Sequence, residues 1–73
     1  MAESIHIGQI IHKELRQQGR TVAWLSQQLN TSRMACYRMF HNYSIDTQVL
    51  YRISRLLGRD FFAEYSSTLN SNK

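Results

Sequence analysis

The feature that most constrains this chain is a pair of short apolar patterns, separated by one break, between residues 21 and 42. Before the break, apolar residues recur at the spacing of one helix face: Val22, Leu25 and Leu29. After it, a second set recurs at a similar spacing: Cys36, Met39 and Phe40. Asn30 stands at the break, and Asn tolerates a left-handed backbone better than any residue except Gly. The stretch therefore predicts two short helices joined by a tight turn.

Two longer amphipathic patterns flank this pair. The first predicts a helix from about Ile5 to Gln18 that ends before Gly19, and the second predicts a helix after Asp46 that ends at Gly58. No stretch alternates as a half-buried strand would, and the 73 residues include no Pro. We expect an all-α, compact bundle of about five short helices in one domain, residues 1–66. Its last helix would run from Phe61 to about Ser66, capped by Asp60, and residues 67–73 would form a polar, disordered tail.

The second helix of the central pair has a polar and basic outer face. Nine Lys and Arg stand against five Asp and Glu, a formal net charge of +4 that favours anionic partners such as nucleic acid. A few net charges also serve solubility alone, so the positions of the cations matter more than their number. The outer face carries Ser32, Arg33, Met34, Tyr37 and Arg38. Two helices crossing through a short turn, the second with such a face, are typical of a helix-turn-helix.

Other classes of function find little support in the sequence. The three histidines have no carboxylate or thiolate at a metal-ligand spacing, and neither paired acids nor a Gly-rich phosphate loop occurs. We therefore expect no enzyme activity, no metal, no cofactor and no small-molecule ligand. The single Cys36 fits a reducing compartment, and neither a membrane-spanning run nor a signal-peptide pattern is present. These observations predict a cytoplasmic protein that does not enter membranes.

Three segments carry a resemblance to a known family. Residues 25–33 read LSQQLNTSR and resemble the family pattern LAxxLGVSR, while residues 45–58 read IDTQVLYRISRLLG and resemble its fourth-helix signature LxxIAxxLG. Cys36 and Met39 fall at buried positions of its third helix. The chain, from about Ile7 to Ser66, resembles the Cro/C1-type (lambda-repressor-like, XRE-type) helix-turn-helix domains. Val22 and the residues YRMF are also similar to the AraC-type helix-turn-helix, a family that needs two such units in a longer chain.

The resemblance implies that the outer face of the third helix enters the major groove of DNA. Base contacts are then expected from Ser32, Arg33, Met34, Tyr37 and Arg38. Arg can donate two hydrogen bonds to guanine, and Met can contact a thymine methyl group. Phosphate contacts are expected around the helix-turn-helix, from Thr21, Asn42, Tyr43, Lys13 and Arg16. The family commonly dimerises through the region after the fourth helix, which implies a homodimer contact at Phe61, Phe62 and Tyr65.

Two functions are therefore kept open. The first is a sequence-specific, DNA-binding regulator of transcription. The alternative is a helical protein-interaction module, such as an antitoxin-like protein that captures a partner. The alternative would gain if the aromatic side chains formed one exposed patch: Trp24, Phe61, Phe62 and Tyr65.

Overall fold

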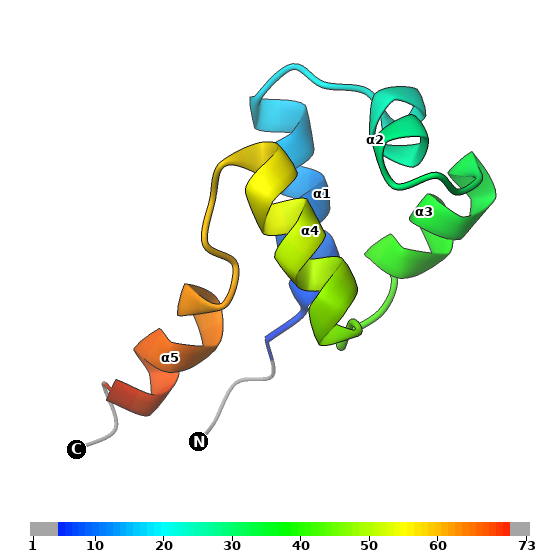
Figure 1. Ribbon diagram of the computed structural model, residues 1–73. Coiled ribbons are helices and arrows are strands. Elements are labelled where there is room, and N and C mark those ends of the chain that lie inside the picture. Colours follow the sequence, from blue (N-terminus) through cyan, green and yellow to red (C-terminus); the bar gives the residue numbers. More distant parts are fainter. Residues whose placement is uncertain (1–4, 71–73) are drawn as a thin grey trace.

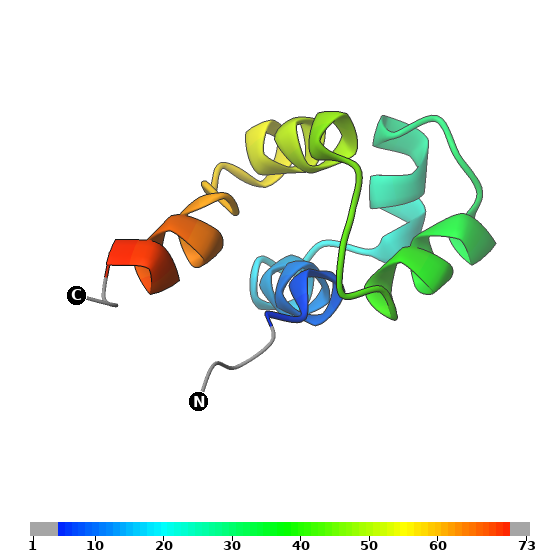
Figure 2. The same ribbon diagram turned by 90° about the horizontal axis from the view of Figure 1, so that it is seen from below.

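The computed structural model describes residues 5–70 and confirms the predicted all-α bundle. Within those residues it contains no strand and five helices: α1 (Ile7–Gln17), α2 (Val22–Gln28), α3 (Arg33–Phe40), α4 (Thr47–Leu57) and α5 (Ala63–Asn70). Figures 1 and 2 show α2 and α3 on one side of the pair formed by α1 and α4, with α5 on the other side. The helix-turn-helix therefore projects from a body built by α1 and α4.

One apolar core joins the first four helices to the segment before α5. It contains Ile7, Ile11, Leu15, Leu25, Cys36, Phe40, Leu50, Ile53, Leu57 and Phe61. The two amphipathic patterns that became α1 and α4 supply six of these ten side chains, so the helical spacing identified the buried faces of both helices correctly. Half-buried apolar residues surround this core, among them Val22, Leu29 and Val49. The burial of α3 depends on only two fully packed side chains, Cys36 and Phe40, so its opposite face stays open to solvent.

Short polar side chains cap three of the helices at their N-terminal ends. Thr21 Oγ1 accepts a hydrogen bond from the amide of Trp24 (3.0 Å), Ser32 Oγ accepts one from Ala35 (3.0 Å), and Asp46 Oδ1 accepts one from Gln48 (2.7 Å). Left-handed backbone occurs at the three expected positions: Gly19 (φ 73°), Asn30 (φ 56°) and Gly58 (φ 66°). Asn30 lets α2 and α3 meet through a short turn, which is the geometry of a helix-turn-helix.

Two predicted boundaries were wrong. Helix α1 begins at Ile7 rather than Ile5, because the Nδ1 of His6 caps it by accepting a hydrogen bond from the amide of Gln9 (3.2 Å). Helix α5 begins at Ala63, two residues later than predicted, and continues to Asn70. Residues 67–70, predicted as part of a disordered tail, are therefore helical. Residues 1–4 of the predicted domain and the last three residues of the predicted tail, 71–73, lie outside the described residues.

A polar bridge fixes α5 to the body. The guanidinium of Arg59 donates to Glu14 of α1 at 2.6 Å and also to Glu64 of α5. Close by, the side-chain amide of Gln18 donates to the carbonyl of Leu57 (2.7 Å) and to Glu14 (2.8 Å). These contacts tie the ends of α1, α4 and α5 together on the side of the molecule away from α3.

Candidate nucleic-acid interface

The outer face of α3 is exposed along its whole length. Met34 and Tyr37 are 63% and 50% exposed, and both Arg33 and Arg38 are exposed as well. Within the part of the chain that the structure describes, neither guanidinium has a hydrogen bond or an ion pair. All four side chains are therefore available to a ligand, and they stand opposite the buried residues of the same helix.

Ser32 and Tyr37 are positioned by contacts of their own. The hydroxyl oxygen of Ser32 accepts the capping hydrogen bond at the start of α3 (3.0 Å), which leaves its proton and one lone pair for a ligand. The ring of Tyr37 packs edge-on against Phe40, with centroids 6.2 Å apart and planes at 87°. This contact holds the Tyr37 ring against α3 and leaves half of the side chain exposed.

The start of α2 adds a cation that the sequence reasoning missed. The guanidinium of Arg20 lies 4.1 Å from the centroid of the Trp24 ring, a cation–π contact, and its Nε donates to Gln18 (3.2 Å). Trp24 is half-buried at the edge of the core. Arg20 directly precedes Thr21, a predicted phosphate contact, so the two residues stand together at the N-terminal end of α2.

The predicted phosphate contacts on α1 lie beside α3. Lys13 and Arg16 are exposed, and with Gln9 and His12 they line a hollow of about 380 Å³. The ring of His12 stacks on Phe40 of α3, with centroids 4.2 Å apart and planes at 2°. Burial, and to a smaller extent the charge of Arg16, lowers the pKa of His12 below its ordinary value of 6.5. This shift favours the neutral form of His12.

The other two predicted phosphate contacts follow α3 directly. Asn42 and Tyr43 are both exposed, and Tyr43 is 59% exposed. The Tyr43 ring lies against His6, with centroids 4.1 Å apart. The structure thus places one predicted contact at the start of α2, two beyond the end of α3 and two on the neighbouring α1.

The charge distribution separates this surface from the rest of the molecule. No Asp or Glu occurs between Leu15 and Ile45, a stretch that contains four arginines: Arg16, Arg20, Arg33 and Arg38. The carboxylates of the described residues lie elsewhere and are engaged, because Glu14 and Glu64 bind Arg59 while Asp46 and Asp60 cap turns or helices. This acid-free stretch is visible in the sequence and would have drawn attention to Arg20.

Comparisons with known proteins add no family. The chain matches no protein-family model, no curated protein and no solved structure. The resemblance to Cro/C1-type domains therefore depends on the sequence motifs of this chain alone.

The predicted dimer contact needs one correction. Phe61 has no exposed surface and belongs to the protomer's own core, so it has nothing to offer a partner subunit. Phe62 and Tyr65 are half-buried, and Leu69 is 74% exposed on the part of α5 that was not predicted. Tyr65 and Leu69 are four positions apart, which places them on one side of α5, and Phe62 lies directly before that helix.

Residues 5–70 contain neither a metal cluster nor a membrane-spanning helix. No three His, Cys, Asp or Glu side chains in this range come together in a way that could hold a metal ion. None of its helices combines the length and the apolar character needed to cross a membrane.

Proposed function

We propose that this chain is a sequence-specific regulator of transcription that binds double-stranded DNA by placing α3 in the major groove. One observation carries the proposal: the exposed face of α3 presents two unpaired arginines within a stretch of chain that has no acidic residue. DNA carries one phosphate charge for about every 1.7 Å of its axis, so a surface without carboxylates avoids repulsion at close approach. We further propose that the chain belongs with the Cro/C1-type domains and acts in the cytoplasm.

The side chains of α3 differ in the chemistry that they would bring to the groove. Arg33 lies in the first turn, the part of a recognition helix nearest the bases, where a guanidinium can donate two hydrogen bonds to guanine. Arg38 lies in the last turn and would reach a base or a phosphate. Met34 offers an exposed apolar surface to a thymine methyl group.

Phosphate contacts would surround this face. Lys13 and Arg16 approach from α1, Thr21 and Arg20 from the start of α2, and a last pair follows α3: Asn42 and Tyr43. Contacts of this kind fix the position of a protein on the duplex and carry no sequence information directly.

The proposal includes a homodimer formed through α5. The apolar surface would come from Tyr65 and Leu69, on one side of α5, and from Phe62 directly before it. A two-fold dimer would set two copies of α3 about 34–36 Å apart, on successive major-groove faces of a palindromic site. Light scattering of the protein, alone and on a selected site, tests this step. A single copy bound to a non-palindromic site would exclude the dimer and leave the DNA proposal intact.

The observations favour DNA over the protein-interaction module. That alternative would have gained from one exposed patch of the aromatic side chains Trp24, Phe61, Phe62 and Tyr65. Phe61 is buried, however, and Trp24 is half-buried beneath Arg20.

Selection of binding sites from random duplex DNA tests the proposed function. Enrichment of one short motif is the expected result, because exposed base-reading side chains line α3. The matched control is the double variant Arg33→Ala with Arg38→Ala, which retains every core residue and should enrich no motif. Failure of the wild-type protein to enrich any sequence contradicts the proposal.

A further inference from the structure

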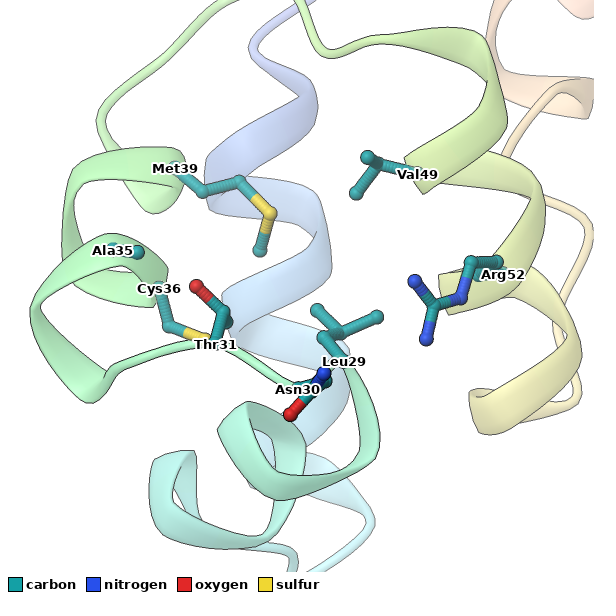
Figure 3. Close-up of a pocket in the computed structure, with 8 residues that line it drawn as sticks. All are labelled: Leu29, Asn30, Thr31, Ala35, Cys36, Met39, Val49 and Arg52. Carbon is teal, nitrogen blue, oxygen red and sulfur yellow. The ribbon is translucent and has the colours of Figure 1, made fainter.

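A cavity of about 330 Å³ opens between the α2–α3 turn, helix α3 and helix α4 (Figure 3). Its apolar walls come from all three elements: Leu29 from the turn, Ala35 and Met39 from α3, and Val49 from α4. Three polar side chains complete it: Asn30 and Thr31 from the turn, and Arg52 from α4. Small-molecule sites are typically concave and largely apolar, with a few polar groups that fix orientation. The smallest such sites have volumes of about 300 Å³, so this cavity is large enough for a small ligand.

Arg52 is held at the edge of this cavity. Its Nη2 donates to the carbonyl of Gln28, the last residue of α2, at 3.2 Å. Figure 3 shows the guanidinium extending from α4 toward the turn. No carboxylate among residues 5–70 pairs with Arg52. A guanidinium has five N–H donors, and the one bond to Gln28 leaves a pair of them for a carboxylate.

The cavity exists because short side chains stand where larger ones would fill it. Ala35 contributes a single methyl group to the wall, beside the long side chain of Met39. Leu29, Met39 and Val49 are only half-buried, so they keep apolar surface toward the opening. Covering that surface with a ligand of similar polarity removes it from water, which is favourable.

We propose that this cavity binds a small monocarboxylic acid with a short, branched apolar body. The carboxylate would accept two hydrogen bonds from Arg52, with Thr31 as a further donor, and the hydrocarbon would lie against Leu29, Met39 and Val49. This site departs from the expectation, drawn from the sequence, that no small molecule binds. The cavity shares Ala35 and Met39 with α3, so a bound acid is placed to influence the orientation of that helix. This last step rests on the proposed function, whereas binding of the acid does not.

Titration with 4-methylpentanoate, followed by the methyl NMR signals of the protein, tests the proposal. Saturable shifts are expected at Leu29, Met39 and Val49, with a dissociation constant on the order of 1 mM for a ligand of this size. The neutral 4-methylpentanamide should bind about tenfold more weakly or worse, because it cannot form the charge-assisted pair. The proposal is overturned if no saturable shift occurs at an acid concentration about ten times the expected dissociation constant. Equal binding of the acid and the amide also overturns it.

Variants separate the two halves of the site. Arg52→Gln should weaken binding of the acid about tenfold, while Arg55→Gln, the next arginine of α4 and outside the cavity, should leave it unchanged. Ala35→Leu should abolish binding by filling the space, and a circular-dichroism melt verifies that it folds. Equal loss in Arg52→Gln and Arg55→Gln contradicts the role of Arg52. Shifts of the same methyl signals on raising the protein concentration, without the acid, would mean that a second copy occupies the cavity and would also overturn the proposal.

Discussion

The amide of Gly8, in the first turn of α1, donates a hydrogen bond to the carbonyl of Asn42, directly beyond α3, at 3.1 Å. A Cβ atom at position 8 would lie 2.4 Å from the carbonyl oxygen of Met39, 2.6 Å from that of Phe40 and 2.7 Å from that of Asn42. All three neighbours are backbone atoms, which cannot move aside as a flexible side chain can. Helix α1 therefore meets the end of α3 at a distance that only glycine permits, and this contact fixes α3 on the body.

Gly8→Ala should lower the free energy of unfolding by about 3 kcal/mol, at the upper end of the usual cost of overpacking, since the backbone must shift. Gly19→Ala is the matched control. A Cβ there meets nothing within 4 Å, and only the left-handed backbone (φ 73°) opposes it, at a cost of about 1 kcal/mol. Chemical denaturation of both variants provides the comparison. A smaller loss for Gly8→Ala than for Gly19→Ala would show that the α1–α3 contact does not constrain the fold.

The bridge at Glu14 predicts a dependence of stability on pH. Hydrogen bonds from Gln18 and Arg59 lower the pKa of Glu14 below its ordinary value of 4.5. A lowered pKa means that the unfolded chain binds the proton more readily. The contribution of Glu14 to stability is therefore complete above pH 4.5 and is lost as the pH falls through the folded-state pKa.

Glu14→Gln should accordingly melt at a lower temperature than the wild-type protein near neutral pH, and the two melting temperatures should converge in acid. Thermal melts of both proteins at a series of pH values measure this. A difference that stays constant across the series would mean that ionisation of Glu14 does not contribute to the bridge.

The sequence was sufficient for most of the fold, because local chemistry specifies it. Thr21, Ser32 and Asp46 cap helices, and Gly58 ends one, through contacts with residues a few positions away. The course of the chain after Gly58 was harder to predict. Neighbouring helical positions point about 100° apart, so the spacing shows that Phe61 and Phe62 diverge without showing which one is buried. The end of α5 carries only Leu69 as an apolar signal, and that side chain is exposed.

The candidate site was predictable to a similar extent. The exposed face of α3 follows from the buried positions Cys36 and Phe40, which the apolar spacing identified. The stacking of Arg20 on Trp24 spans four residues and could have been considered. The cavity beside Arg52 depends on how three elements pack together, and no local pattern reports such an arrangement.

Arg33 should determine specificity. Arg33→Ala is expected to cost about 1–3 kcal/mol on a selected site and little on random DNA, because a contact to a base edge is lost. Lys13→Ala should weaken binding to both DNAs alike, since a phosphate contact does not read sequence. Equilibrium binding of the two variants to the two DNAs measures this. If Arg33→Ala loses the same affinity for both DNAs, Arg33 contacts a phosphate and not a base.

Titration with duplex DNA over a range of salt concentrations tests the central claim, that the face of α3 binds DNA, most directly. The logarithm of the binding constant should fall linearly with the logarithm of the salt concentration, with a slope of about −0.9 for each phosphate neutralised. Lys13→Ala should make that slope shallower by the amount of about one phosphate contact. The double variant Arg33→Ala with Arg38→Ala should reduce the affinity more than Lys13→Ala does. A protein that binds no duplex DNA even at the lowest salt concentration would contradict the account.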